Sequence, residues 1–416
     1  MRSLRVWAWL LRVEQAVVES VELDGDGRSV VVVSVRPFRV AASRCVVCGR
    51  RCPGFDRGQG RRRWRTFNVG VVRCYLEADA PRVRCGEHGV RVAAVPWARR
   101  DAGHTRGFDE QVAWLVRHMS KLAVCRLLGV SWRTVGRIVA RVVADLDAAG
   151  GDRLDGLTRI GIDEISYRRG HKYLSVVVDH DTGRLVWIAP GRDKATLSRF
   201  FTLLGPQRCA QIALVSADGA EWIFSAVTEH CRNAKICLDP FHVVAWAGKA
   251  LDAVRAQVYQ QARRAGQTAL ARGIKGARYA LWKDPAALTA RQQATLAQIE
   301  TTNQPLYRGY LLHQQLRQVF ASGGPERVEL LDAWLDWAAA SGLPPFVDLA
   351  YRIRRDFRDD IANTLIHRLS NGRVESVNTK IRLLTRIAFG FHSPEALIAL
   401  VRLHLGGYPI DLPTPT

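Results

Sequence analysis

Three acidic residues occupy positions from which carboxylates could act together on a phosphate group. Asp163 interrupts the apolar segment Ile160–Ile165, where burying a carboxylate is costly unless a metal ion or a hydrogen-bond donor compensates. Asp218 follows an apolar strand-like segment and would lie at the carboxyl end of a strand, where α/β proteins gather their sites. Glu375 lies in the polar stretch Asn371–Lys380, which predicts the start of a helix. Such oxygen ligands suit Mg²⁺ or Mn²⁺, and two such ions support in-line phosphoryl transfer.

The predicted helix of Glu375 carries two further polar residues on the same face. Asn378 and Arg382 follow Glu375 by three and seven residues, so the three side chains line up on a helix. An acid, an amide and a base on one face suit a phosphate site better than they suit packing. Arg382 is interpreted either as a contact to a phosphate near the scissile bond or as an ordinary surface arginine.

A second aspartate competes with Asp218. Asp239 also ends a predicted strand and lies close to His242. We favour Asp218 because it follows the fourth strand of the predicted core. His242 has two interpretations, as a residue that positions DNA or as a structural histidine. Glu164 is expected to point to the opposite face of the sheet from Asp163, which argues against Glu164 as a metal ligand.

The segments around these acids predict an α/β core of the RNase H-like class. Three strands, a helix, a strand, a helix and a strand are expected at residues 159–165, 173–179, 185–189, 194–204, 211–216, 220–231 and 234–238. In such a sheet the first and fourth strands are neighbours, which would bring Asp163 and Asp218 together. The chain from Val243 to about Leu369 is almost wholly helical, so we interpret it as a helical insertion that precedes the helix of Glu375.

Two pairs of metal-binding residues precede this core. Cys45 and Cys48 form a C-x-x-C pair, and Cys85 and His88 form a C-x-x-H pair, each next to a glycine that allows a tight turn. Four such sulfur and nitrogen ligands suit tetrahedral Zn²⁺. Cys52 and Cys74 are the main rivals for a ligand position. The basic run Arg61–Arg65 between the pairs is either a solvated loop or a contact to phosphates.

A helix-turn-helix is predicted between the cysteine pairs and the core. A first helix is expected at 110–119, and the motif itself at 120–139, with Gly129 in the turn and Ser131 as the cap of the second helix. Ala123 is small where the helices would cross closely. Val135 and Ile138 are expected to face inward. The side chains expected to face solvent or DNA are Trp132, Arg133, Arg137 and Arg141.

The overall composition favours a polyanionic partner. The 416 residues carry 61 Lys and Arg against 39 Asp and Glu, a formal net charge of +22. Residues 1–150 alone hold 27 basic and 14 acidic residues, as expected if this part grips phosphates. Nine cysteines without a periodic framework argue against a secreted disulfide scaffold. Because the apolar start is too short for a signal peptide and no uncharged apolar run reaches ~20 residues, we expect a cytoplasmic protein.

Several motifs resemble one family of bacterial proteins. Asp163-Glu164 is followed by His171-Lys172-Tyr173-Leu174, Ser216-Ala217-Asp218, Leu238-Asp239-Pro240-Phe241-His242 and Asn371-Gly372-Arg373-Val374-Glu375. With the zinc pairs and the helix-turn-helix before them, these segments look like the ISL-three family of insertion-sequence transposases, over nearly the whole chain. The resemblance implies a DDE triad of Asp163, Asp218 and Glu375 with Mg²⁺ or Mn²⁺, and a structural Zn²⁺.

The resemblance also implies a function and an organisation. A DNA transposase would bind double-stranded DNA at the terminal inverted repeats of its element, cut it and transfer the strand to target DNA, as a homo-oligomer associated with the bacterial nucleoid. The alternatives are a non-catalytic, domesticated DNA-binding protein and an RNase H-like nuclease without strand transfer. We expect a β-rich zinc module at 1–100, a helix-turn-helix domain at 101–150, the first part of the core at 151–246, the insertion at 247–368 and the helical remainder of the core at 369–416. The turn-forming Asp24–Gly27 predicts a hairpin in the first of these domains.

Overall fold

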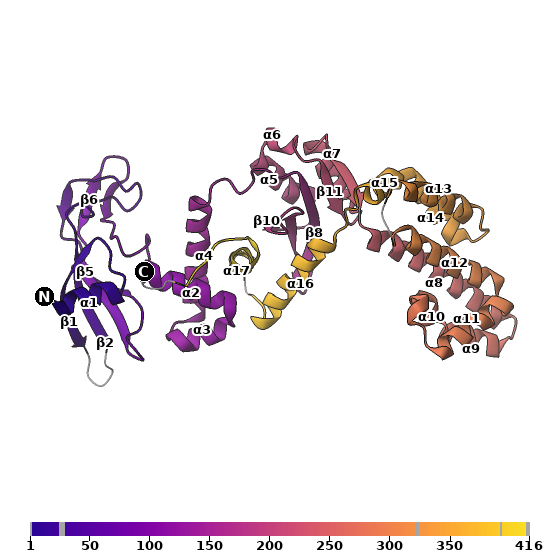
Figure 1. Cartoon of the computed structure of the whole chain (residues 1–416), viewed down its shortest axis with the longest axis horizontal. Coiled ribbons are helices and arrows are strands. Elements are labelled where there is room, and N and C mark those ends of the chain that lie inside the picture. The colour runs from indigo at the N-terminus through magenta and orange to yellow at the C-terminus, as the bar shows by residue number, and fades with distance from the viewer. Residues whose placement is uncertain (1, 25–29, 322–323, 392, 413–416) are drawn as a thin grey trace. The chain divides into compact units, whose positions relative to one another are not determined.

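The computed structural model describes residues 2–24, 30–321, 324–391 and 393–412, and divides into two compact units (Figure 1). Unit 1 comprises Met1–Gly151 and Leu384–Thr416, and unit 2 comprises Asp152–Leu383. None of the described helices is long and apolar enough to cross a membrane. The glycines of the predicted Asp24–Gly27 turn lie outside the described residues.

The first part of unit 1 is built on two small sheets. After helix α1 (Arg2–Leu10), one sheet has the strand order β1-β2-β5-β4, and a second has the order β3-β6-β7. The strands are β1 (Ala16–Asp24), β2 (Val30–Pro37), β3 (Gly54–Asp56), β4 (Arg61–Arg65), β5 (Arg73–Asp79), β6 (Arg82–Cys85) and β7 (Gly89–Val92). β1 and β2 pair antiparallel, as the predicted hairpin requires. Alternating apolar residues such as Val33, Leu76 and Trp64 fill the core beneath the larger sheet.

Four helices form the second part of unit 1. They are α2 (Arg106–His118), α3 (Lys121–Leu128), α4 (Trp132–Ala149) and α17 (Pro394–Leu405). Leu400 and Leu403 of α17 share one apolar cluster with Val112 and Val139. The predicted grouping of 369–416 with the catalytic core therefore differs from the structure, in which α17 packs against α4. The reason is an apolar face of α17, with Ala399, Leu400 and Leu403, that is buried in that cluster.

The core of unit 2 is one five-stranded sheet with the order β10-β9-β8-β11-β12. Its elements are β8 (Arg159–Arg168), β9 (Lys172–Asp179), β10 (Leu185–Pro190), α5 (Lys194–Leu204), α6 (Pro206–Cys209), β11 (Leu214–Ala217), α7 (Glu221–His230) and β12 (Lys235–Leu238). β8, β9 and β10 pair antiparallel, whereas β11 runs parallel to β8 and to β12. The predicted RNase H-like element order and the predicted β8–β11 neighbourhood are confirmed.

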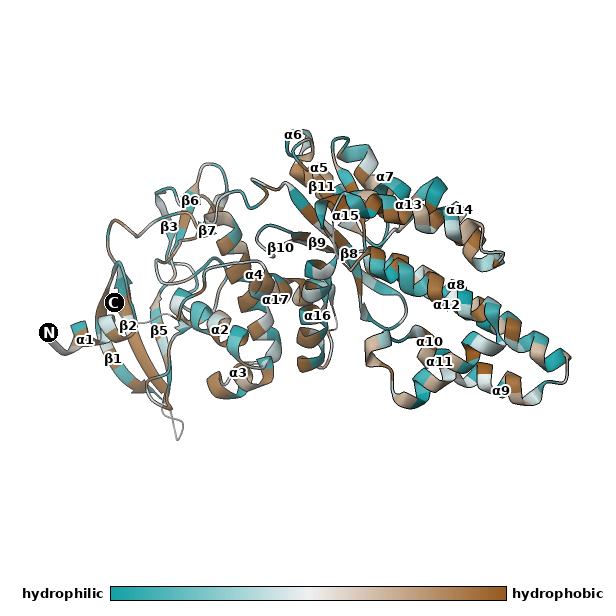
Figure 2. Ribbon diagram, turned by 45° about the vertical axis from the view of Figure 1, so that its right-hand side comes forward, coloured by the Kyte–Doolittle hydropathy of each residue, from teal (hydrophilic) through white to brown (hydrophobic). Residues whose placement is uncertain are grey.

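A long helical insertion follows β12. Its helices are α8 (Pro240–Arg264), α9 (Thr268–Gly276), α10 (Arg278–Trp282), η1 (Pro285–Ala287), α11 (Ala290–Thr302), α12 (Gln304–Val319), α13 (Glu326–Ala339), α14 (Pro344–Asp356) and α15 (Arg358–His367). Figure 2 shows hydrophilic and hydrophobic residues alternating along α8 and α12, as expected of helices that bury one face. Leu251, Trp334 and Phe346 are fully buried in the shared core.

The insertion starts earlier than predicted. α8 begins at Pro240, directly after Asp239, and runs without a break through the expected boundary at 247. Pro240 suits the first turn of a helix, because its missing N–H has no partner there in any case. After α15, the chain turns into α16 (Gly372–Ile387), the helix that carries Glu375.

Candidate active site and metal centre

Asp163 and Asp218 meet at the carboxyl ends of neighbouring strands. The parallel pairing of β11 with β8 ends at Ser216 and Gly161, so Asp163 and Asp218 both lie just beyond the paired segment. The Asp218 carboxylate accepts a hydrogen bond from Ala220 N at 3.0 Å, which orients it at the start of the next turn. One oxygen each of Asp163, Glu164 and Asp218 lie within 4.8 Å of one another. These hard donors fit a divalent cation such as Mg²⁺.

Glu164 lies with these acids, contrary to the prediction that it points to the opposite face. Its side chain is only 11% exposed, and its Oε1 lies 2.7 Å from Arg192 Nε. Oε2 is buried and has no hydrogen-bond partner among the described residues. The pairing of β8 with β11 ends at Gly161, so Asp163 and Glu164 both lie beyond the paired part of β8 on that side. Strand alternation alone therefore missed a member of the cluster.

The protonation of Asp163 is strongly shifted. Burial, opposed by the N–H of Glu164 and reinforced by the charge of Asp218, raises the pKa of Asp163 to about 7. Its Oδ1 accepts from Glu164 N at 2.8 Å, and its Oδ2 accepts from Asn378 Nδ2, also at 2.8 Å. A cation beside Asp163 would favour the charged carboxylate, so the site is built to gain from one.

Glu375 lines the same cleft from α16. Its carboxylate is 58% exposed and forms an ion pair with Arg382, with 2.8 Å between Arg382 Nη1 and Glu375 Oε1. Asn378 is fully buried on the same helix. The three residues thus divide into an exposed ion pair and a buried amide that contacts Asp163. The cleft has a volume of about 770 Å³, and its charged or titratable lining residues are Asp163, Glu164, Asp218, Asp239, His242, Glu375 and Arg382.

Asp239 has a different environment from Asp218. It is 8% exposed, and its two oxygens are occupied by Asn371 N and by His242 Nδ1, each at 3.1 Å. The hydrogen bond between His242 and Asp239 is the main reason that the pKa of His242 is raised, which favours the charged imidazolium. Phe241, between them, is 76% exposed although it lines the cleft.

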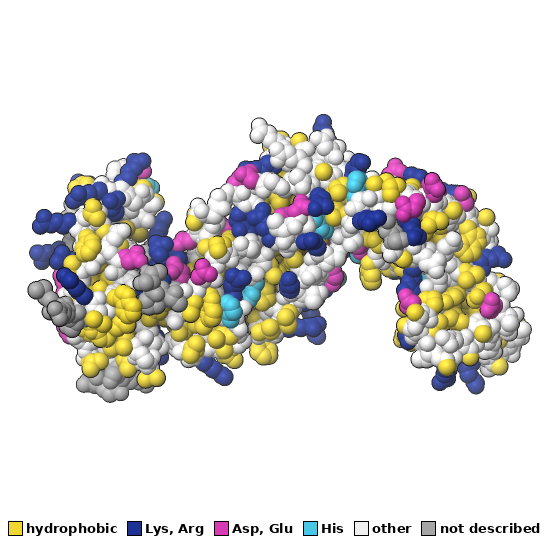
Figure 3. All heavy atoms as spheres, in the orientation of Figure 1, with side chains coloured by type: hydrophobic (Ala, Val, Ile, Leu, Met, Phe, Trp, Pro, Cys, Tyr) yellow, Lys and Arg dark blue, Asp and Glu magenta, His cyan; other side chains and the backbone are white. Residues whose placement is uncertain are grey.

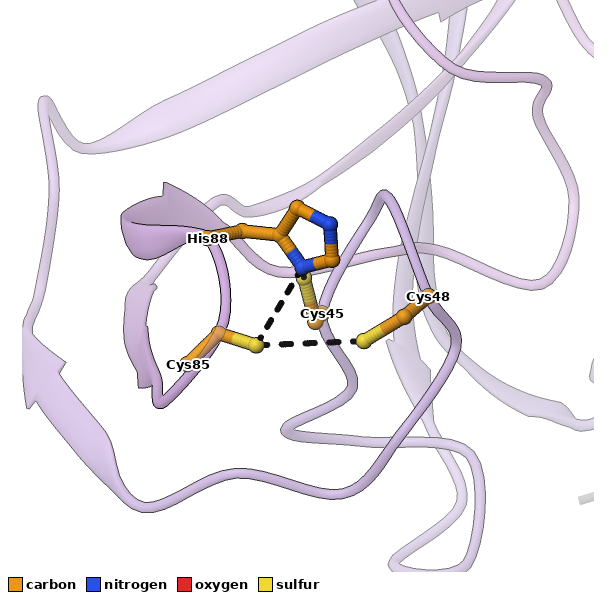
Figure 4. Close-up of side chains that lie close together, drawn as sticks. All are labelled: Cys45, Cys48, Cys85 and His88. Atoms are coloured by element: carbon orange, nitrogen blue, oxygen red, sulfur yellow. Dashed lines mark hydrogen bonds between the residues drawn. The ribbon is translucent and has the colours of Figure 1, made fainter.

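The two predicted metal-binding pairs converge in unit 1 (Figure 4). One ligand atom each of Cys45, Cys48, Cys85 and His88 lie within 4.8 Å of one another. The Sγ atoms of Cys48 and Cys85 are 3.8 Å apart, and Cys85 Sγ lies 3.5 Å from His88 Nδ1. Tetrahedral Zn–S bonds of about 2.3 Å imply an S···S separation of about 3.8 Å, so the cluster fits Zn²⁺.

Neither rival cysteine belongs to this four-residue cluster, although Cys52 lies beside it and contacts Cys85. Cys74 is fully buried in β5, where burial raises the pKa of its thiol to about 11. Cys52 donates its S–H to Arg50 O. By contrast, a hydrogen bond from His88 is the main cause that lowers the pKa of Cys85 to about 6, as expected for a thiol poised to bind metal.

The basic run between the pairs is the strand β4 and not a loop. Trp64 and Arg65 are buried, and Arg65 donates to the backbone oxygens of Thr66 and Leu128. Arg63 pairs with Glu77 at 2.8 Å. Figure 3 shows other Lys and Arg side chains gathered around β6, and the exposed arginines of this region include Arg57, Arg82, Arg84 and Arg91.

The predicted helix-turn-helix is present as α3 and α4. Gly129 adopts φ 63° in the turn, a left-handed conformation that glycine tolerates best, and Ser131 Oγ accepts from Thr134 N at 3.1 Å. Val135 and Ile138 are fully buried, as predicted.

Of the side chains predicted to face DNA, Trp132, Arg133 and Arg137 are exposed, although the Trp132 ring also lies under Lys121 Nζ at 4.5 Å. Arg141 does not fit the prediction. Its guanidinium contacts Asp109, which is 0% exposed, at 3.3 Å. A buried carboxylate must be paired, and Arg141 shares that role with Arg99.

Comparison with known proteins agrees with this geometry. Three family models match in order: the zinc-finger of transposase IS204/IS1001/IS1096/IS1165 at residues 41–88, the helix-turn-helix domain of transposase family ISL3 at 93–143, and a transposase model at 160–401. The chain is 53% identical to the transposase for insertion sequence element IS1557 of Mycobacterium tuberculosis, over 99% of this chain and 98% of the relative. It is 27% identical to the transposase for insertion sequence element IS1001 of Bordetella parapertussis, over 94% and 95%.

The last of these models spans the five-stranded sheet, the helical insertion and the helix of Glu375. The other two cover the cysteine–histidine cluster and α3–α4. With the near full-length similarity to the mycobacterial protein, these matches show that the chain belongs to the ISL3 (ISL-three) family of insertion-sequence transposases.

Proposed function

We propose that Asp163, Asp218 and Glu375 hold Mg²⁺ or Mn²⁺ in the cleft of unit 2 for the cleavage and strand transfer of transposon DNA. The observation that carries this proposal is the approach of Asp163 and Asp218 within 4.8 Å, in a cleft that Glu375 also lines. Bound Mg²⁺ would supply Lewis acidity toward the attacking and leaving oxygens. The protein's part is to hold the three carboxylates and to accept the DNA phosphate between them.

The environments of the two candidate aspartates support Asp218 as the second acid. Asp239 already accepts from the backbone of Asn371 and from His242, so it stabilises the start of α16. Asp218 shares its cluster with Asp163. His242 carries a raised pKa and could present a positive charge to DNA.

Arg382 would exchange partners during this function. Its guanidinium forms an ion pair with the Glu375 carboxylate. A cation that engages Glu375 would release the guanidinium, which is two helical turns along the same face. Arg382 would then be placed to contact a phosphate near the scissile bond.

The remaining assignments follow the modules of unit 1. Cys45, Cys48, Cys85 and His88 would bind the structural Zn²⁺. From the start of α4, the side chains of Trp132, Arg133 and Arg137 would contact the bases or the phosphate backbone of the terminal inverted repeats. Two DNA ends must be brought together, so we expect a homo-oligomer on DNA. As domains, we propose 1–100 for the zinc module, 101–150 with α17 for the helix-turn-helix, and a core interrupted from Pro240 by the insertion.

Cleavage of labelled DNA that carries the terminal repeats, with Mg²⁺ present, tests the triad. Glu375→Gln should abolish cleavage and keep DNA binding. Glu229→Gln is a matched control, because Glu229 is also an exposed glutamate in an ion pair, with Lys194. Full cleavage by Glu375→Gln would refute the triad, as would equal losses in both variants.

A further inference from the structure

We infer that Asn371 is a positioning residue, which sets the place of Glu375 relative to Asp163 through a buried chain of hydrogen bonds with Ser216 and His180. This inference rests on the proposed role of Glu375. Ser216 precedes Asn371 by 155 residues and follows His180 by 36. All three residues are buried: Ser216 is 0% exposed, and Asn371 and His180 are each 5% exposed.

The chain of hydrogen bonds has one consistent direction. The Ser216 hydroxyl donates to Asn371 Oδ1, so its oxygen remains to accept from His180 Nε2 at 2.7 Å. His180 must therefore carry its proton on Nε2. Burial, reinforced by the nearby positive charge of Arg373, lowers the pKa of His180 to about 4, which keeps the ring neutral at pH 7.

Asn371 connects this chain to both sides of the catalytic cleft. Its Nδ2 donates to Ile162 O at 3.4 Å, next to Asp163 on β8. Its own carbonyl accepts from Glu375 N at 2.8 Å, in the first turn of α16. Asn371 thus hydrogen-bonds to the backbone next to Asp163 and to the backbone of Glu375, the two proposed metal ligands on either side of the cleft.

A further hydrogen bond joins the backbone of Asn371 to a third strand. The backbone N–H of Asn371 donates to Asp239 Oδ1, at the end of β12. Asn371 is therefore bonded to three strands: β8 through Ile162, β11 through Ser216 and β12 by way of Asp239. Loss of the side-chain bonds would remove two of the contacts that fix the first turn of α16, although Asn378 would still contact Asp163 farther along the helix. The first turn, which carries Glu375, would then be free to shift by a fraction of an ångström.

The test compares Asn371→Ala and Ser216→Ala with a matched control, Thr364→Val. The Thr364 hydroxyl is equally buried in unit 2 and donates to Leu238 O at 2.8 Å, but it makes no bond to α16. Ser216→Ala is the milder change, and it interrupts the chain even if Asn371→Ala does not fold. The measurements are melting temperature, DNA affinity and the Mg²⁺ concentration that gives half-maximal cleavage of terminal-repeat DNA.

We expect comparable losses of melting temperature in Ser216→Ala and Thr364→Val. Only Ser216→Ala and Asn371→Ala should raise the half-maximal Mg²⁺ concentration, by roughly tenfold or more, because a misplaced Glu375 binds the cation less well. An unchanged Mg²⁺ dependence in folded Ser216→Ala and Asn371→Ala would overturn the inference. A Glu375→Gln variant that cleaves normally would instead refute the proposed function itself, which separates the two failures.

Discussion

Replacing Gly161 with alanine tests whether α16 must lie directly against β8. A Cβ at this position would lie 2.3 Å from Val374 Cγ2, 2.7 Å from His180 Nε2 and 3.0 Å from Ser216 Oγ. Ordinary contact begins at 3.4 Å, so Val374 must retreat by about 1.1 Å. Val374 is fully buried and adjoins Glu375, so this displacement moves the proposed ligand.

Two magnitudes follow for Gly161→Ala. Overpacking of this kind costs about 1–3 kcal/mol of unfolding free energy. A displacement near 1 Å at a reacting site costs roughly 100-fold in rate. Single-turnover cleavage of saturating terminal-repeat DNA should therefore slow by about that factor, while DNA affinity is kept, because the helix-turn-helix belongs to unit 1.

Two further variants make this prediction specific. Gly273→Ala is the control, because a Cβ there meets nothing within 4 Å and the substitution lies in α9 of the same unit. Adding Val374→Ala to Gly161→Ala removes the closest clashing methyl group and should restore part of the rate. Wild-type cleavage by Gly161→Ala would refute the close packing of α16 on β8, and so would an equal loss in Gly273→Ala.

Three other outcomes are expected. Cys85→Ser should lower the zinc content measured by atomic absorption and Cys52→Ser should not, and equal zinc in both would contradict the ligand set. Arg137→Ala should weaken DNA binding by about 1–3 kcal/mol with an unchanged melting temperature. Arg141→Ala should instead destabilise the fold by about 1–3 kcal/mol, because it leaves the buried carboxylate of Asp109 without one of its partners. The reverse pattern would contradict both assignments. Because burial raises the pKa of Asp163 from 3.8 to about 7, the folded state binds its proton more tightly, and stability without Mg²⁺ should fall as the pH rises from about 4 to 7. The unfolding free energy of Asp163→Asn, measured with urea, should lack this fall between about pH 4 and 7. Equal slopes of unfolding free energy against pH in the wild type and the variant would contradict the raised pKa.

Local signals in the sequence were enough for much of the fold. The helix at Lys194–Leu204 was predicted with its observed ends, and Gly129 and Ser131 perform the predicted turn and cap. These features depend on neighbours a few residues away, through hydrophobic periodicity and capping, so a single sequence contains them. The RNase H-like class followed from the order of such elements.

Features that depend on distant partners were not determined this way. Arg141 reads as an exposed helical arginine, but it pairs with Asp109, and α17 joins α4 although more than 240 residues separate them. Strand alternation placed Glu164 away from Asp163, whereas both acids lie beyond the end of the β8–β11 pairing and approach Asp218 together.

The candidate site shows the same division. The sequence alone determined which acids are candidates, because a charge inside an apolar run is visible there. Only the tertiary structure decided how each candidate is occupied: Asp239 accepts from Asn371, 132 residues later, and Asp218 does not share those donors. Long-range packing sets the partners of a buried carboxylate, and those partners distinguish a structural acid from one that remains available to a metal ion.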